Sequence, residues 1–179
     1  IAKRPEAKAH LARQFFDKTT RRTYRALVWG RLKEPEGTIV GNIGRDERDR
    51  LQMAVYPEGS PKGKHAVTHY TLIEELAYVS WIECRLETGR THQIRAHLAA
   101  HGLYIVCDPL YGGNRKPVRL SDFKKKWNGD AFEERPLLAR LALHAYKLTI
   151  AHPATGERMT FCAPYPKDMD ATRKQLVKL

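Results

Sequence analysis

The spacing of apolar residues along the chain predicts a helix first and mostly strands after it. Leu11 and Phe15 recur on one side of a helix that has Pro5 in its first turn, and Thr19 marks its end. A second helix is predicted from Thr91 to about residue 100, and a third covers residues 168–179.

Alternating or continuously apolar segments between these helices predict strands. The predicted strands cover residues 23–29, 64–76, 77–86, 137–151 and 158–163, and short extended pieces are predicted around residues 38–43 and 52–55. The last two are joined by His152-Pro153-Ala154-Thr155-Gly156-Glu157, which is typical of a hairpin turn. Consecutive strands with short connections predict one α+β domain over residues 1–179, with a largely antiparallel sheet flanked by helices.

Two segments are too polar to predict regular core elements. Residues 31–63 are rich in glycine, proline and charge, which favours hairpins and loops over a surface. Residues 114–136 contain the cluster Lys124-Lys125-Lys126-Trp127, and we interpret this segment as a basic surface excursion from the core.

Composition adds a strong positive charge to this picture. The 179 residues include 32 Lys and Arg against 20 Asp and Glu, which gives a net charge of +12. Such a surplus favours a polyanionic partner such as RNA, although a basic surface without a specific partner has the same composition. No apolar segment approaches the roughly 20 residues that span a bilayer, so we expect no membrane partner. We also expect a cytoplasmic protein that is a monomer.

The three cysteines, Cys84, Cys107 and Cys162, lack the spacing of a metal or disulfide motif. We therefore expect them to be reduced and mostly buried.

The short helix that begins near residue 91 concentrates the candidate chemistry. Ile94 and Leu98 form its apolar stripe, with Arg95 on one flank and His97 on the other. A half-buried guanidinium must be paired. Either Arg95 is tied to a neighbouring glutamate or backbone carbonyls, or it is held against a catalytic carboxylate or a substrate phosphate. Arg90 adds charge where the helix N-terminus already favours anions.

The same region contains candidate metal ligands. His97 and His101 are four residues apart, and His92 and Cys107 are close in sequence. No Glu follows His97, however, and no second pair has ligand spacing. Solvent-facing or hydrogen-bonded histidines are the better interpretation, so we predict no metal. The absence of a glycine-rich phosphate loop argues against a nucleotide cofactor.

Tyr24 is the second candidate. It shares one face of its predicted strand with Ala26 and Val28, so it could simply be a core aromatic residue. It could also stack on a base, with Arg22 and Arg25 next to it for phosphates.

Five segments together carry a family resemblance. They are Arg22-Thr23-Tyr24-Arg25-Ala26-Leu27-Val28, the block from Glu87 to His97 (E-T-G-R-T-H-Q-I-R-A-H), Cys107-Asp108-Pro109-Leu110-Tyr111-Gly112, Leu143-His144-Ala145 and His152–Glu157. In order and spacing they resemble the RluA-type RNA pseudouridine synthases over nearly the whole chain. Cys107 departs from the family pattern, which usually has glycine there.

The resemblance implies an isomerase that converts uridine to pseudouridine in ribosomal or transfer RNA, without a metal or organic cofactor. It implies that Arg95, or as runner-up Arg90, positions a nucleophilic aspartate, that Tyr24 stacks on the flipped uracil, and that Leu143 forms an apolar wall. The residues expected to bind RNA are Arg22, Arg25, Arg45, His92, Gln93, Lys124, Lys125 and Lys126.

The family's nucleophile lies in an H-R-L-D-x-x-T-S-G segment, and no R-L-D occurs in this sequence. Residues 1–7 resemble the residues that follow that segment. We therefore expect the chain to be the C-terminal part of a catalytic domain and to be inactive alone. The alternative is a non-catalytic RNA-binding module, and a metal-dependent hydrolase is a third candidate.

Overall fold

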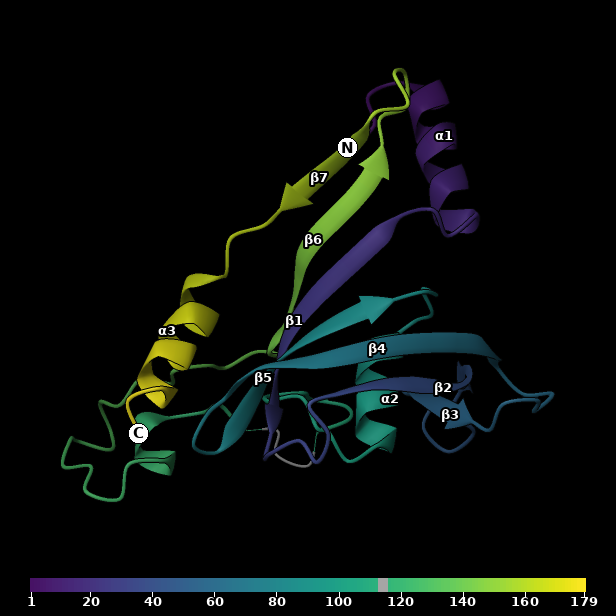
Figure 1. Cartoon of the computed structure of the whole chain (residues 1–179). Coiled ribbons are helices and arrows are strands. Elements are labelled where there is room, and N and C mark those ends of the chain that lie inside the picture. Colours follow the sequence, from purple (N-terminus) through teal and green to yellow (C-terminus); the bar gives the residue numbers. More distant parts are fainter. Residues whose placement is uncertain (113–115) are drawn as a thin grey trace.

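The computed structural model describes residues 1–112 and 116–179 (Figure 1). Its α-helices are Pro5–Phe16 (α1), Gln93–Ala100 (α2) and Lys167–Leu176 (α3), and Leu120–Asp122 form a short 3-10 helix (η1). Its strands are Arg21–Trp29 (β1), Glu36–Arg45 (β2), Met53–Tyr56 (β3), Lys64–Glu75 (β4), Val79–Leu86 (β5), Leu143–Ala151 (β6) and Arg158–Cys162 (β7).

The strands form one 7-stranded sheet in the order β3-β2-β4-β5-β1-β6-β7, and each neighbouring pair is antiparallel. Contacts join α2 to β2, β3 and β4, and α1 to β6 (Figure 1). The predicted α+β class with an antiparallel sheet is confirmed. The predicted hairpin turn is confirmed as well, because the N–H of His152 donates to the carbonyl of Glu157 over 2.7 Å.

The segment 137–151 departs from the single long strand that was predicted. The strand begins only at Leu143, because the preceding residues bond to other parts of the chain. Ala142 donates its N–H to the carbonyl of Val106 and accepts the N–H of Leu27, while Leu138 pairs with Val118. This irregular backbone places Leu138 and Ala142 in the core, where both are buried.

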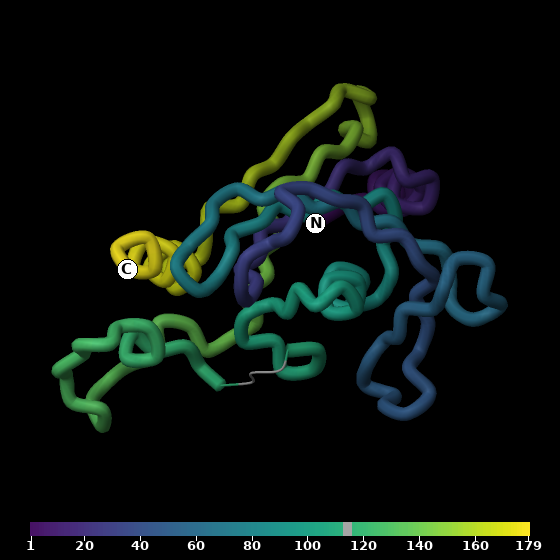
Figure 2. Tube along the Cα trace, turned by 60° about the horizontal axis from the view of Figure 1, so that its bottom comes forward, coloured from purple at the N-terminus to yellow at the C-terminus, as the bar shows by residue number. Residues whose placement is uncertain are grey.

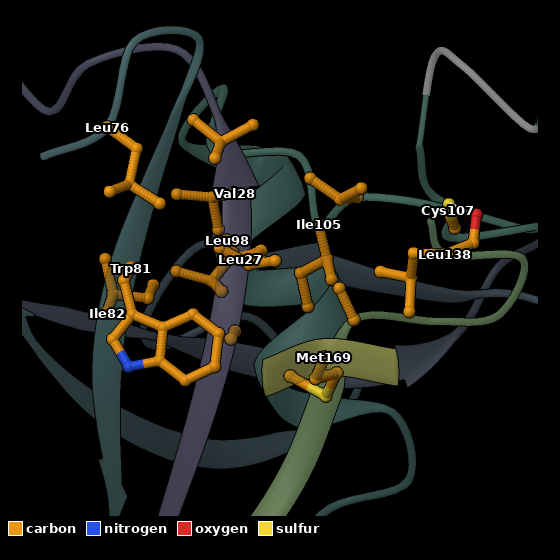
Figure 3. Packing of buried hydrophobic residues seen from close by; sticks show 14 of the residues in the cluster. Leu27, Val28, Leu76, Trp81, Ile82, Leu98, Ile105, Cys107, Leu138 and Met169 are labelled. Carbon is orange, nitrogen blue, oxygen red and sulfur yellow. Dashed lines mark hydrogen bonds between the residues drawn. The ribbon is translucent and has the colours of Figure 1, made fainter. Parts of the chain in front are cut away.

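The core surrounds the second half of β1. The consecutive residues Ala26, Leu27 and Val28 are all buried, which requires both faces of the sheet to be covered at this point. Figure 3 shows Leu27 and Val28 among neighbouring core side chains that include Leu98 of α2 and Trp81 of β5. On the face of the sheet opposite α2, which we call the second face, Trp81 pairs with Leu27. The Trp81 ring makes an edge contact with Tyr165, just before α3.

The basic segment 114–136 contributes more to the core than predicted. Val118 and Phe123 are buried, and the Phe123 ring packs 6.1 Å from Trp29 and 5.2 Å from Tyr78. The interpretation of the segment as lying wholly outside the core is therefore wrong for these two side chains. Figure 2 shows the rest of the segment running outside the sheet. Lys124–Lys126 are exposed, and residues 114 and 115 lie outside the described part.

All three cysteines are free, and Cys84 and Cys107 are buried while Cys162 is exposed, in agreement with the prediction. Within the described residues, no helix has the length and apolar character needed to cross a bilayer.

Candidate active site

The loop at residues 87–92, which we call the motif loop, is fixed to the sheet by one buried amide. Gln93, the first residue of α2, accepts hydrogen bonds at Oε1 from the N–H of Arg90 (2.9 Å) and the hydroxyl of Thr88 (2.8 Å). Its Nε2 donates to the carbonyl of Val67 (2.9 Å) and to the hydroxyl of Thr68 (3.0 Å) on β4. These bonds satisfy the whole amide. Gln93 therefore has no group left with which to bind RNA, contrary to the prediction.

Gly89 joins the motif loop to β1. The guanidinium of Arg22 occupies the space that a Cβ at residue 89 would need. Arg22 also lies over the Phe15 ring, with Cζ 5.9 Å from the ring centroid. The Arg22 side chain lines both a cavity of about 400 Å³ beside Tyr24 and a polar groove of about 1020 Å³. The segment Arg22–Val28 and the block Glu87–His97 are thus in direct contact through Arg22 and Gly89.

Arg95 of α2 makes a two-point ion pair with Asp108. Its Nε donates to Oδ2 over 2.8 Å and its Nη2 donates to Oδ1 over 2.7 Å. The Asp108 side chain is fully buried, and that of Arg95 is 11% exposed. The predicted requirement that Arg95 be paired is confirmed, and the partner is a carboxylate from the turn at residues 108–111, which we call the Asp108 turn.

Burial alone would raise the pKa of Asp108. The hydrogen bonds from Arg95 and from the backbone N–H groups of Tyr111 and Leu110 outweigh it, so the pKa of Asp108 is lowered. The same hydrogen bond raises the pKa of Arg95. Both groups are therefore charged at neutral pH, and the guanidinium is held in a fixed orientation.

Tyr111 extends this cluster to His92 and β3. The guanidinium carbon of Arg95 lies 4.9 Å from the centroid of the Tyr111 ring. The Tyr111 hydroxyl accepts the N–H of Met53 over 2.7 Å and lies 3.0 Å from Nδ1 of His92. Burial and the nearby charge of Arg95 lower the pKa of His92. The positive charge of Arg45 also lowers the pKa of His92, so this predicted RNA-binding residue lies near the cluster.

Tyr24 lies on the face of the sheet that carries α2. Thr68 of β4 faces α2, because its hydroxyl bonds to His97. Leu86 of β5 pairs with Thr68, and Arg22 of β1 pairs with Leu86. Residues opposite one another, and residues two apart on a strand, share a face, so Tyr24 lies on this face too. It is half-buried and lines the 400 Å³ cavity with Phe15, Leu148 and Phe161.

Leu143 lies opposite Ala26 in β1 and is half-buried. Tyr24 and Arg95 lie on the same side of the sheet. Among the described residues no hydrogen bond joins them, and Arg95 does not line the cavity beside Tyr24.

Arg25 differs from its predicted role. As the neighbour of Tyr24 on a strand, it points to the second face, where its Nη2 bonds to Glu83 over 2.9 Å. Its guanidinium also packs 4.9 Å from the Tyr146 ring centroid, and its side chain is only 14% exposed. Arg25 is thus neutralised within the fold and does not flank the Tyr24 ring. Arg90 bonds through Nε to the carbonyl of His65 and stays at the surface.

His92, His97 and His101 are all hydrogen-bonded, as predicted. His97 is fully buried with Nδ1 2.9 Å from the Thr68 hydroxyl, and burial lowers its pKa to about 4. Nδ1 of His101 bonds to the carbonyl of His97. No group of three His, Cys, Asp or Glu that could hold a metal is found among the described residues.

Sequence reasoning did not assign Asp108 and Tyr111 to the site, although both lie in one of the five segments that carry the family resemblance. The signal was present, because a half-buried arginine needs an acidic partner, and Asp108 is the first acidic residue after Arg95 in the sequence. The geometry defines a protein class with one rigid, charged arginine and a half-buried tyrosine pocket on the same face of the sheet. This is an arrangement suited to an anionic substrate.

Comparison with known proteins identifies the family. A sequence model of the family described as RNA pseudouridylate synthase matches residues 1–100. An uncharacterized RNA pseudouridine synthase of Chlorobaculum parvum is 41% identical over 176 residues, which are 98% of this chain and 53% of the relative. The ribosomal large subunit pseudouridine synthase D of Neisseria meningitidis serogroup B is 43% identical over 171 residues, 94% of this chain and 42% of the relative. The chain belongs to the RNA pseudouridylate synthase family.

Solved structures agree on the fold. The human RNA pseudouridylate synthase domain containing 1 has a TM-score of 0.67 at 28% identity, covering 92% of this chain and 62% of that one. The human RNA pseudouridylate synthase domain containing 4 has a TM-score of 0.73 at 22% identity, covering 97% and 68%, and shows a shared fold. The chain spans about half the length of the curated relatives it matches.

Proposed function

We propose that this chain is the C-terminal part of the catalytic domain of an RNA pseudouridine synthase. The enzyme would detach uracil from C1′ of the ribose and reattach it through C5, so that the N1–C1′ bond breaks and a C5–C1′ bond forms. N1 gains a proton and C5 loses one, so the reaction needs no oxidant, metal or organic cofactor. The observation that carries the proposal is the oriented Arg95 inside the Glu87–His97 block, which lies within the residues that the family model matches.

Arg95 has donors left for a second anion. A guanidinium has five N–H groups, and Asp108 uses the one on Nε and one on Nη2. The remaining three can bind the nucleophilic aspartate that the family resemblance places upstream of this sequence. A fixed positive charge favours the ionised form of that aspartate, which is the form that attacks.

Tyr24 and Leu143 would contact the uracil after it leaves the RNA stack. A half-buried ring next to a cavity of about 400 Å³ can stack on one base face, and an apolar side chain can cover the other. Arg22, Arg45 and Lys124–Lys126 would bind phosphates, and Arg90 would support the site from the motif loop. We propose ribosomal RNA as the first substrate to test, in a cytoplasmic monomer.

The test compares arginine variants in the whole protein that contains this chain. RNA labelled with tritium at C5 of uridine releases its label when the C5–C1′ bond forms. We expect Arg95→Lys to lower this release at least about 100-fold, because lysine cannot make the planar two-point contacts. Arg140→Lys is the matched control, since Arg140 makes the same two-point pair with Asp168 at an exposed position.

Equal tritium release by both variants would remove Arg95 from the mechanism. RNA binding without any release by the wild-type whole protein would favour the non-catalytic RNA-binding module instead.

A further inference from the structure

His92 has an unusual backbone at the start of α2. Its φ of 53° and ψ of 20° are left-handed, and its side chain makes no capping bond to the helix. Such a conformation costs free energy for any residue with a Cβ, so it persists only where surrounding contacts hold it. The His92 side chain contacts Tyr111, whose ring lies 5.7 Å from the imidazole at an interplanar angle of 87°, and the His92 carbonyl accepts the N–H of Ala96 over 2.9 Å.

The hydrogen bonds around Tyr111 decide where the imidazole carries its proton. The backbone N–H of Met53 can only donate, so the Tyr111 oxygen accepts it over 2.7 Å. The phenolic hydrogen is then free to point at Nδ1 of His92, 3.0 Å away. With Nδ1 accepting, a neutral His92 must carry its hydrogen on Nε2. The opposite arrangement would leave the phenolic hydrogen of Tyr111 without a partner.

The charged groups around His92 keep it neutral. Its own burial and the positive charges of Arg95 and Arg45 lower the pKa of His92, and the negative charge of Asp108 opposes them without reversing the shift. Within the described part of the chain, Nε2 of His92 has no hydrogen-bond partner. It is also not among the unpaired polar atoms that are buried there, so solvent can reach it. A solvent-accessible N–H of fixed direction therefore stands one helical turn from Arg95.

We propose that His92 donates this Nε2–H to a carbonyl oxygen of a uracil in the bound RNA, and that Tyr111 is the positioning residue that fixes the donor. The contact with uracil rests on the proposed function, whereas the Tyr111–His92 arrangement does not. A carbonyl suits the donor better than a phosphate does, because the neighbouring arginines already supply charge for phosphates and a neutral imidazole adds direction without charge. If the carbonyl is O4, the donor also discriminates against cytosine, because cytosine has an amino group at that position, which cannot accept the bond.

The first experiment reads the tautomer in the 179-residue chain by nitrogen-15 NMR of the histidine side chains at neutral pH. We expect His92 to show a protonated Nε2 and an unprotonated Nδ1. Tyr111→Phe keeps the ring over Arg95 but removes the hydroxyl, and it should give His92 a mixture of tautomers. Tyr104→Phe is the control, since Tyr104 is an exposed tyrosine whose hydroxyl has no hydrogen bond in the described residues. Protonated Nδ1 in the wild type would overturn the positioning role.

The second experiment adds one of two RNA stem-loops that differ only in the loop, which holds either uridines or abasic riboses. Movement of the His92 Nε2 signal with the uridine loop alone supports the carbonyl contact. Equal movement with both loops would mean a phosphate contact, and no movement would mean no contact, and either result overturns the proposal.

Affinity gives an independent measurement. Tyr111→Phe and His92→Ala should each weaken binding of the uridine loop about three- to tenfold, the value of one hydrogen bond, and leave the abasic loop within about twofold. If the whole protein forms no pseudouridine while His92 shows the expected tautomer and uridine contact, the proposed function is contradicted and the Tyr111–His92 arrangement is not.

Discussion

Replacing Asp108 with asparagine removes one charge of the Arg95 pair and keeps the shape of the side chain. Asp108 is fully buried and accepts from Arg95 at both oxygens, so one carboxylate oxygen becomes an NH2 group that faces the guanidinium. Breaking a buried ion pair from one side costs about 3–5 kcal/mol. Because the Arg95 side chain keeps 11% of its exposure, we expect a loss of about 2–4 kcal/mol in the free energy of unfolding.

Urea unfolding of the 179-residue chain measures this loss, with Asp168→Asn as the matched control. Asp168 makes the same two-point contact with Arg140, but the two side chains are 38% and 46% exposed, so its loss should be at most about 1 kcal/mol. The pKa of Asp108 is lowered in the folded chain, so its contribution is present above the unfolded pKa near 3.8 and is lost as pH falls through the folded pKa. Equal losses for the two variants at neutral pH would refute the claim that the Arg95 pair is a buried, structure-determining contact.

Three further outcomes follow from the same geometry. Gly89→Ala should displace the Arg22 guanidinium, whose place the new methyl group takes, and weaken RNA binding; an unchanged Arg22 side-chain signal in NMR would contradict this. RNA affinity should fall steeply with salt, and replacing Lys124–Lys126 with alanine should reduce the magnitude of the slope by up to about 3, whereas a flat response would mean that the charge of +12 has no role in binding. The pKa of His97 is lowered from 6.5 to about 4, so the unfolded chain binds more protons between these values and stability should fall by about 2–3 kcal/mol as pH drops through them. His97→Gln should lack this step in urea unfolding measured from pH 7 to pH 4, and an identical pH profile would show that His97 is not buried in its neutral form.

The sequence was a good guide to the elements and a weaker one to the partners of the site residues. Helical spacing identified Ile94 and Leu98 as the buried side of α2 because that pattern depends on local geometry alone. The position of Arg25 could also have been derived, since alternation along β1 places it on the opposite face from Tyr24. The pairing of Arg95 with Asp108 depends instead on how the chain returns after α2, where Cys107 takes a left-handed φ of 56°. Long-range contacts of this kind, like the insertion of Phe123 beside Trp29, are set by packing and leave no periodic signal.

The segment 137–151 shows the same limit. Its apolar residues suit a strand, but tertiary hydrogen bonds from Ala142 to Val106 and Leu27 replace the strand pairing before Leu143. Propensity was overridden by partners distant in sequence.

Formation of pseudouridine by the whole protein tests the central claim most directly. Ribosomal RNA labelled with tritium at C5 of uridine would be incubated with the whole protein and, separately, with the 179-residue chain, which contains no R-L-D segment. The account predicts tritium release with a matching amount of pseudouridine for the whole protein and none for the 179-residue chain, because a covalent nucleophile cannot be replaced by the remaining electrostatics. Release by the 179-residue chain alone, or RNA binding by the whole protein without any release, would contradict it.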